Sequence, residues 1–235
     1  MQRRIAYVED DDVIRTNYTE MLSDEGFVVT SYANKEDAIA AFQEELPDLA
    51  LLDVSLHGER DAGYQVCSEL RRLSNEVPII FLTSHDGEID RISGLRVGAD
   101  DYITKDSSIN YIIVRIEALF RRLEAVRSAY SHASGSDSKD DIDGIKLDDV
   151  YSTVFWKGTK IDLPLTHFWI VKDICTNPGK VRNHRDLMKA ANIVVEPNTI
   201  TAHVKAIRDA FIAADPEFKC IRTERGRGYR WVSGQ

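Results

Sequence analysis

The 235-residue chain is 43% hydrophobic and 29% charged, with a formal net charge of −9, a composition and length that suit two soluble globular domains. No apolar run approaches the roughly 18 residues needed to cross a bilayer, and acidic residues begin at Glu9, so the sequence argues against a membrane-spanning or secreted protein. The three cysteines are widely spaced in apolar stretches, which predicts buried free thiols in a reducing cytoplasm.

The charge is unevenly distributed along the chain. Residues 1–123 contain 13 basic and 24 acidic residues, a net charge of −11, whereas residues 145–235 contain 15 basic and 10 acidic residues, a net charge of +5. An acidic half joined to a basic half indicates two functions, and the basic half is a candidate for binding a polyanion.

Residues 1–126 alternate between strand-like apolar runs and helical patterns. Strands are expected at residues 4–8, 27–32, 49–53, 78–83 and 101–105, and helices at residues 13–26, 34–46, 64–73, 88–98 and 109–126. The strands at 49–53 and 78–83 are nearly all apolar, as buried central strands of a parallel sheet are. The pattern predicts an α/β domain with a five-stranded, doubly wound parallel sheet.

Residues 127–144 are rich in Ser, Asp and Gly, which predicts a flexible linker between two domains. Residues 145–235 begin with short strand-like pieces and continue with helical patterns at residues 166–177, 184–192 and 197–215. The last stretch, residues 219–233, contains two strand-like runs around a glycine-containing turn. Three helices followed by a hairpin predict an α+β helix-turn-helix domain with a wing.

Charged and hydroxyl side chains follow the ends of four expected strands in residues 1–126. In chain order they are Glu9 and Asp10, Asp53, Thr83, and Lys105. Because ligands of an open parallel sheet bind at the carboxyl ends of the strands, we expect these side chains to converge. Converging carboxylates raise one another's pKa unless a cation lies among them, and Mg²⁺ prefers oxygen ligands. The predicted Mg²⁺ ligands are Glu9, Asp10, Asp53 and the carbonyl of Ser55.

The predicted site suits phosphoryl transfer to a carboxylate. Asp53 beside Mg²⁺ can act as a nucleophile toward a phosphoryl group, while Lys105 neutralises its oxygens and Thr83 donates a hydrogen bond to one of them. An aspartyl phosphate would change the local charge and could switch a surface. The alternative is that the strand-end residues form plain ion pairs.

Asp11 and Asp12 are expected to start the first helix, where acids interact favourably with the helix dipole.

Several motifs carry a resemblance to a known family. The segments "VEDDD", "LLDVSL", "FLTS" and "GADDYITK" resemble the receiver domain of two-component response regulators, and "LPLTHFWIV", "NPGKV", "NTITAHVKAIR" and "IRTERGRGYRW" resemble the OmpR-type winged helix. The chain is therefore similar to the OmpR/PhoB branch of response regulators. This resemblance implies a flavodoxin-like receiver at residues 1–126 and a winged-helix DNA-binding domain at residues 145–235.

The resemblance also implies roles for individual residues. Glu9 and Asp10 match the Mg²⁺ ligands, Asp53 the phospho-acceptor, Thr83 the phosphate-sensing hydroxyl, Lys105 the ammonium group and Tyr102 the switch aromatic. The implied partners are a sensor histidine kinase, double-stranded DNA and, in some members, RNA polymerase. The segment between Leu187 and Asn198 is shorter than is usual in the family, which weakens the last expectation.

Two departures from the family pattern lie near the predicted site. Asp106 stands where the family usually has a proline, so a trans peptide bond is expected after Lys105. The segment after Asp53 is about two residues longer than usual, with His57 in place of a proline, and this could alter access to the site. Ser55 and His85 occupy positions that tune the phosphate lifetime in the family.

The resemblance further implies a symmetric dimer formed on phosphorylation. The matching charged residues are Arg91, Asp100, Asp101, Arg115 and Arg122, and the matching apolar residues are Ile92, Leu95 and Ile113. Val97 and Tyr111 replace two acids of the family interface, so we expect a dimer with a modified interface. The alternative is that these charges form only local ion pairs.

The helical pattern at residues 197–215 has the periodicity of a DNA-recognition helix. Ile200, Val204, Ile207 and Phe211 share the face expected to pack on the core. The candidate DNA contacts are Asn198, Thr199, Thr201, His203, Lys205 and Arg208 in the helix and Arg225 and Arg227 in the hairpin turn. His203 is equally compatible with packing.

The sequence thus predicts a phosphorylation-switched transcriptional regulator that binds repeated DNA half-sites and is not a turnover enzyme. A phosphorylation-independent winged-helix regulator is the first alternative, motivated by Asp106 and the altered dimer acids. A Mg²⁺-dependent phosphatase is the second. It is disfavoured because such enzymes place an acid two residues after the nucleophile, where this chain has Ser55.

Overall fold

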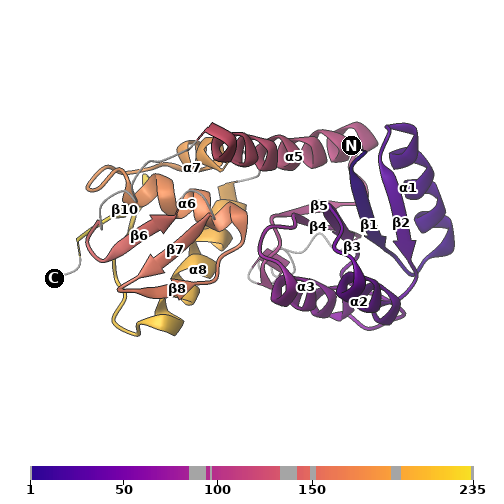
Figure 1. Ribbon diagram of the computed structural model, residues 1–235, viewed down its shortest axis with the longest axis horizontal. Coiled ribbons are helices and arrows are strands. Elements are labelled where there is room, and N and C mark those ends of the chain that lie inside the picture. The colour runs from indigo at the N-terminus through magenta and orange to yellow at the C-terminus, as the bar shows by residue number, and fades with distance from the viewer. Residues whose placement is uncertain are drawn as a thin grey trace. The chain divides into compact units, whose positions relative to one another are not determined.

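The computed structural model (Figure 1) describes residues 2–84, 94–95, 97–132, 142–148, 152–191 and 197–233, without the side chains of residues 122, 125–132 and 197–198. The chain folds into two compact units, residues 1–116 and 117–235, which are described separately below. None of the described helices is both long enough and apolar enough to cross a membrane.

The first unit contains the predicted parallel sheet. Its elements are β1 (Arg4–Val8), α1 (Asp12–Asp24), β2 (Val28–Tyr32), α2 (Lys35–Glu44), β3 (Leu49–Leu52), α3 (Ala62–Leu73), β4 (Ile79–Thr83), β5 (Asp101–Thr104) and the start of α5 (Ile109–His132). The strand order is β2-β1-β3-β4-β5, and every pairing is parallel. The prediction of a five-stranded, doubly wound sheet is therefore confirmed. Most of the helix expected at 88–98 lies outside the described residues, although Gly94, Leu95 and Val97 are helical.

Local sequence signals explain where these elements begin and end. All residues of β3 and β4 are buried, and α2 and α3 follow one face of the sheet while the start of α5 follows the other (Figure 1). Asp11 caps α1 by accepting hydrogen bonds from the amides of Val13 and Ile14. Asp12 is the first residue of that helix, so both acids start α1 as predicted.

Helix α5 is longer than expected. It continues to His132, so the prediction of a flexible linker from residue 127 was wrong for residues 127–132. The stretch from residue 124 to 132 contains no glycine or proline that would end the helix. Residues 133–141 lie outside the described residues, and the domain boundaries at 126 and 144 stay predictions.

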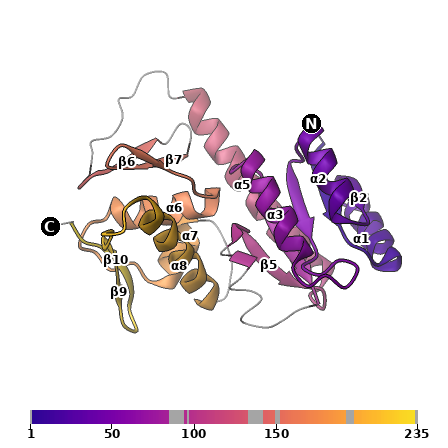
Figure 2. The same ribbon diagram turned by 90° about the horizontal axis from the view of Figure 1, so that it is seen from below.

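The second unit contains the predicted winged helix-turn-helix elements. They are β6 (Ile145–Asp148), β7 (Thr153–Trp156), β8 (Thr159–Ile161), α6 (Leu165–Cys175), α7 (His184–Ala190), α8 (Pro197–Ala214), β9 (Ile221–Glu224) and β10 (Gly228–Trp231). Strands β6, β7 and β8 form an antiparallel sheet. The β9–β10 hairpin lies beside α8 (Figure 2). Three helices followed by a hairpin are therefore confirmed.

The core of the second unit is an aromatic cluster. Trp156, Phe211, Phe218 and Trp231 are buried, and the ring centroids of Trp156 and Phe218 are 5.1 Å apart. Such edge-to-face and stacked ring contacts add to the free energy gained from burying apolar area. Elsewhere, Cys67, Cys175 and Cys220 are buried free thiols, as expected, and burial raises the pKa of the Cys67 thiol to about 12.

Asp215 should make the second unit sensitive to acid. Its carboxylate accepts hydrogen bonds from Lys157 Nζ and Trp156 Nε1, each at 2.8 Å, and these hydrogen bonds lower its pKa from 3.8 to about 2. A lowered folded-state pKa gives a stabilising contribution that is present above pH 3.8 and is lost as the pH falls toward about 2. We expect wild type to lose more stability than Asp215→Asn between about pH 5 and about pH 2.5.

Urea unfolding followed by tryptophan fluorescence measures this effect, because all three tryptophans lie in the second unit. Asp162→Asn, at an exposed carboxylate paired with Lys160, serves as a control and should keep the wild-type pH dependence. An unchanged pH dependence in Asp215→Asn would contradict the prediction.

Candidate functional site

The carboxyl ends of β1, β3 and β5 bring together three acids and one lysine. Ligand oxygens of Glu9, Asp10 and Asp53 all lie within 4.8 Å of one another. Lys105 Nζ lies 2.6 Å from Glu9 Oε2 and 2.6 Å from Asp53 Oδ2. Thr83 is buried at the end of β4, between β3 and β5 in the sheet. We call Glu9, Asp10, Asp53, Thr83 and Lys105 the strand-end cluster.

Burial and ion pairing have opposite effects on the pKa values of the charged groups in this cluster. Burial raises the pKa of the Glu9 carboxyl, although the hydrogen bond from Lys105 acts in the other direction. Burial alone would lower the pKa of Lys105, but its hydrogen bonds to Asp53 and Glu9 outweigh that effect, so the pKa is raised. Lys105 therefore carries its positive charge at neutral pH and lies between two carboxylates.

The donor set of the cluster suits a hard divalent cation. Three carboxylates are close enough to contribute oxygens to one ion, and Mg²⁺ typically needs only one or two together with water and a phosphoryl oxygen. Glu9 and Asp53 share a single ammonium group, so an added cation would reduce the repulsion among the three acids. The residues therefore fit Mg²⁺. Ser55 lies in the loop two residues after Asp53, and its carbonyl as a ligand stays a prediction.

Three contacts with the cluster were not predicted, although His57 was expected near the site. The Tyr7 hydroxyl donates to Glu9 Oε2 at 2.9 Å, and the Tyr18 hydroxyl donates to the Lys105 carbonyl at 3.1 Å. The His57 amide donates to Asp10 Oδ2 at 2.7 Å. Strand alternation could have identified Tyr7, since residues two apart share a face. The other two contacts join segments distant in sequence, which no local pattern reveals.

Gly63 was also missed. Its amide donates to the Val54 carbonyl at 2.9 Å, and a Cβ at this position would lie 1.9 Å from the Asp53 carbonyl oxygen. Only glycine therefore lets the first turn of α3 approach the backbone that carries Asp53. The available signal was a glycine immediately before the helix expected at residues 64–73.

The structure describes part of the predicted switch region, including Tyr102 and the peptide bond after Lys105. Tyr102 is buried on β5, with its ring centroid 6.1 Å from that of Phe81. The Lys105–Asp106 peptide bond is trans, as expected. His85 lies outside the described residues.

The residues predicted for a dimer face are mostly buried within the first unit. Arg115 Nε lies 2.6 Å from Asp101 Oδ2, and Arg71 Nη2 lies 2.8 Å from Asp100 Oδ2, with all four side chains largely buried. Asp100, Asp101 and Arg115 therefore form ion pairs within the chain, as the alternative of local ion pairs expects, and their place in a dimer interface stays a prediction. Leu95 and Ile113 are also buried, so they form no exposed apolar patch. Arg91, Ile92 and the side chain of Arg122 lie outside the described residues.

Helix α8 presents the predicted faces. Ile200, Val204, Ile207 and Phe211 are fully buried, whereas Thr201 and Lys205 are exposed. Arg225 and Arg227 are exposed in the turn of the β9–β10 hairpin. The side chain of Asn198 lies outside the described residues. These four exposed residues, of which three are basic, thus lie on α8 and at the tip of the hairpin.

Three predicted DNA contacts are placed differently. Thr199 and His203 are buried, and His203 Nδ1 lies 3.0 Å from His167 Nε2 on α6. Arg208 is half-buried and directed at the hairpin, donating to the Ile221 carbonyl at 2.8 Å. The burial of Thr199 and His203 argues against direct DNA contact by these two side chains, whereas contact between the half-buried Arg208 and DNA stays a prediction. Burial lowers the pKa of Arg208, although the nearby Tyr229 acts in the other direction.

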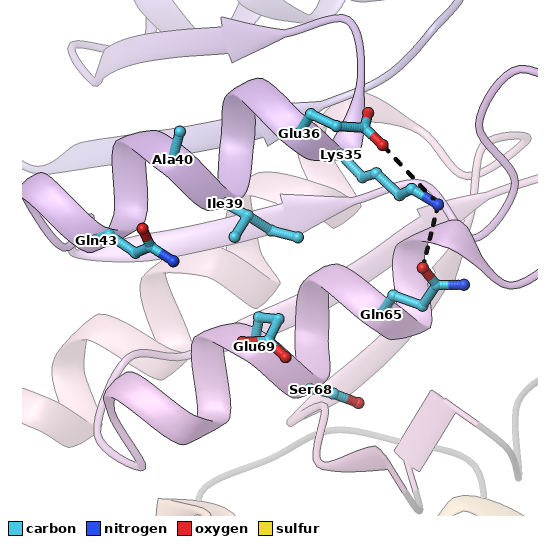
Figure 3. Close-up of a pocket in the computed structure, with 8 residues that line it drawn as sticks. All are labelled: Lys35, Glu36, Ile39, Ala40, Gln43, Gln65, Ser68 and Glu69. Carbon is cyan, nitrogen blue, oxygen red and sulfur yellow. Dashed lines mark hydrogen bonds and ion pairs between the residues drawn. The ribbon is translucent and has the colours of Figure 1, made fainter.

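A separate hollow of about 580 Å³ lies between α2 and α3 (Figure 3). Its lining residues are Lys35, Glu36, Ile39, Ala40, Gln43, Gln65, Ser68 and Glu69. Lys35 Nζ is already paired with Glu59 Oε2 and lies 3.1 Å from Gln65 Oε1. The strand-end residues are not among its lining residues, so this hollow is not part of the cluster.

Comparisons with known proteins agree with both halves of the structure. The family model described as "Response regulator receiver domain" matches residues 5–117, and that described as "Transcriptional regulatory protein, C terminal" matches residues 158–231. The chain is 34% identical to the sensory transduction protein RegX3 of Mycobacterium tuberculosis, over 96% of this chain and 97% of that protein. It is 30% identical to the phosphate regulon transcriptional regulatory protein PhoB of Escherichia coli, over 98% of both chains.

A solved structure of a RitR mutant supports the fold alone. It has a TM-score of 0.77 and 20% sequence identity, covering 99% of this chain and 100% of that one.

Proposed function

Because the chain belongs to the OmpR/PhoB family of two-component response regulators, and is therefore a phosphorylation-regulated transcription factor, we propose that Asp53 is its phospho-acceptor. The observation that carries this proposal is the position of Asp53 at the end of β3, with Lys105 Nζ 2.6 Å from its Oδ2 atom. Asp53 Oδ1 accepts the Val54 amide, which fixes the orientation of the carboxylate. Proteins of this family are transcription factors and not classical enzymes.

The other residues of the cluster would assist the transfer. Glu9, Asp10, Asp53 and the Ser55 carbonyl would hold Mg²⁺, which supplies positive charge to the transferred phosphoryl oxygens when bound. An Asp53 oxygen forms the new bond to phosphorus while the bond to the donor's leaving group breaks. Lys105 would pair with one phosphoryl oxygen, and the Thr83 hydroxyl would donate to another. Thr83 and Tyr102 would then transmit the change, as in a switch based on local charge.

The output would be tighter DNA binding. The Asn198, Thr201 and Lys205 positions of α8 would enter the major groove, and Arg225 and Arg227 of the hairpin would reach the minor groove. Phosphorylation would favour a homodimer that binds repeated half-sites. A sensor histidine kinase would supply the phosphoryl group in the cytoplasm, hydrolysis of the aspartyl phosphate would reset the protein, and RNA polymerase is a further candidate partner.

Incubation with a small phosphodonor and Mg²⁺, followed by intact-mass measurement, tests the assignment of Asp53. Wild type should gain the mass of one phosphoryl group, and Asp53→Asn should gain none. Asp61→Asn, which removes an exposed carboxylate eight residues further along the chain, is a matched control and should behave as wild type. Equal gain in wild type and Asp53→Asn would overturn the proposal.

DNA affinity measured in the same samples tests the regulatory consequence. Phosphodonor treatment should raise the affinity of wild type and leave that of Asp53→Asn unchanged. Equal affinity of wild type before and after treatment would instead favour a phosphorylation-independent DNA-binding regulator.

A further inference from the structure

A set of contacts ties the middle of α8 to the hairpin strands. Arg208 Nε and Nη2 lie 3.1 and 2.8 Å from the Ile221 carbonyl oxygen, and Nη2 lies 2.9 Å from Thr223 Oγ1. The guanidinium also lies over the ring of Tyr229, 5.6 Å from its centroid. One arginine of α8 therefore contacts both β9 and β10.

Tyr229 provides a second connection from the hairpin to α8. Its hydroxyl donates to Thr201 Oγ1 at 3.3 Å. Thr201 and Arg208 are seven residues apart, close to two helical turns, so they lie on the same side of α8. The hairpin thus contacts one side of the helix at two positions that are two turns apart.

The other side of the hairpin base is held by the segment before α7. The Tyr229 amide and carbonyl pair with the Arg182 carbonyl and amide at 2.9 and 2.7 Å. A Cβ on Gly228 would lie 2.0 Å from the Arg182 carbonyl oxygen, and Gly228 has a φ of 134°, so only glycine permits this approach. The hairpin base is therefore held on two sides, whereas Arg225 and Arg227 are exposed at its tip.

We propose that Arg208 is a positioning residue that sets the hairpin against α8, so that the hairpin tip and the exposed face of the helix engage DNA together. This inference rests on the proposed function, in which both elements contact DNA. The planar fork of arginine suits the paired contacts with Ile221 and Thr223, and a lysine cannot reproduce them. Moving Arg208 onto a phosphate would take both guanidinium donors away from the carbonyl of the buried residue Ile221, which is unfavourable.

A coupling experiment separates positioning from direct DNA contact. The probe is a random-sequence DNA duplex, and its affinity is measured as a function of salt for Arg208→Lys, Arg208→Met, the tip variant Arg225→Ala/Arg227→Ala, and their combinations. If Arg208 positions the hairpin, the hairpin tip contributes less to DNA binding in the Arg208 variants. The tip substitutions should then reduce affinity several-fold less in those variants than in wild type, because the effects of coupled residues do not add. The salt slope should fall by about 2 in the tip variant and fall no further in the combinations.

The Lys variant is decisive because it keeps the charge and loses the fork. Arg208→Lys should behave like Arg208→Met. If Arg208→Lys instead retains wild-type affinity, Arg208 contacts phosphate and the proposal is overturned. The same conclusion follows if the affinity losses of Arg208→Met and the tip variant multiply in the combined variant, and if its salt slope falls by about 1 more than in the tip variant. Lys205→Met, one turn away on the exposed face of α8, is the matched contrast, and its loss should multiply with that of the tip variant.

Amide hydrogen exchange without DNA tests the same inference independently of the proposed function. The amides that pair β9 with β10 across the hairpin should exchange faster in Arg208→Lys than in wild type, whereas Lys205→Met should leave them unchanged. Unchanged hairpin exchange in Arg208→Lys would refute the positioning role. Faster exchange together with a tip variant that binds DNA like wild type would keep the positioning role and refute the DNA-binding role of the hairpin. Tryptophan fluorescence confirms that each variant is folded, since all three tryptophans lie in this unit.

Discussion

Replacing Arg115 with leucine should destabilise the first unit by about 3–5 kcal/mol, because the variant leaves a buried carboxylate without its cation. Asp101 and Arg115 are 3% and 4% exposed, and Arg115 Nε lies 2.6 Å from Asp101 Oδ2. The other carboxylate oxygen of Asp101 accepts the Tyr102 amide at 2.8 Å. Once the guanidinium is removed, water can reach the Asp101 carboxylate only if α5 moves away from β5. The carboxylate otherwise stays buried without a cation.

The two units can be followed separately in one urea titration of the full chain. Tryptophan fluorescence reports only the second unit, since Trp156, Trp169 and Trp231 all lie there, and far-UV circular dichroism reports both. In Arg115→Leu, part of the dichroism change should move to lower urea concentration while the fluorescence transition stays in place.

Two further variants make the Arg115 prediction specific. Arg72→Leu removes an exposed arginine of α3 that pairs with Glu69, and such exposed pairs contribute about 0–1 kcal/mol. Asp101→Leu/Arg115→Leu replaces both charges and should recover much of the stability, since a buried ion pair often contributes no more than an apolar pair of similar size. An Arg115→Leu protein as stable as Arg72→Leu would contradict the internal pairing and favour an exposed interface.

This ion pair illustrates where the sequence is ambiguous. The motif around Asp101 has the composition of a dimer face, but residue types alone do not say whether a carboxylate at the start of β5 meets α5 of the same chain or of a partner. Arg208 presents the same problem, because it has the helical spacing expected of a DNA-facing residue and yet bonds to the hairpin. Periodicity assigns a residue to a side of a helix. It does not identify what occupies that side.

The fold and the strand-end cluster were predictable for a different reason. Apolar runs of strand length, separated by helical periodicity and helix caps such as Asp11 and Asn34, specify the alternating architecture locally. Parallel strands then place their carboxyl ends on one edge, so Glu9, Asp53 and Lys105 follow from topology. The contacts of Tyr18 and His57 with this cluster depend on the paths of loops and helix positions, which no local pattern encodes.

Gly63→Ala should destabilise the first unit by about 1–3 kcal/mol or more, because it overpacks a site where two backbones meet. The added Cβ would lie 1.9 Å from the Asp53 carbonyl oxygen, 2.8 Å from its carbonyl carbon and 2.9 Å from Val54 Cα. All three atoms belong to the backbone, so no side chain can rotate away. Either α3 moves outward or the end of β3 shifts, and both changes disturb the hydrogen bond from the Gly63 amide to the Val54 carbonyl.

The position of Gly63 makes this a prediction about function as well as stability. A shift at the end of β3 moves the Asp53 carboxylate away from Lys105, so the rate of phosphoryl gain from a small phosphodonor should fall even at temperatures where Gly63→Ala is folded. Ser68→Ala, at an exposed position of the same helix, is the control for stability and for rate and should match wild type in both. A Gly63→Ala protein with wild-type urea unfolding and wild-type phosphorylation rate would show that α3 does not constrain Asp53. A loss of stability with an unchanged rate in the folded protein would show that α3 yields while β3 holds Asp53 in place.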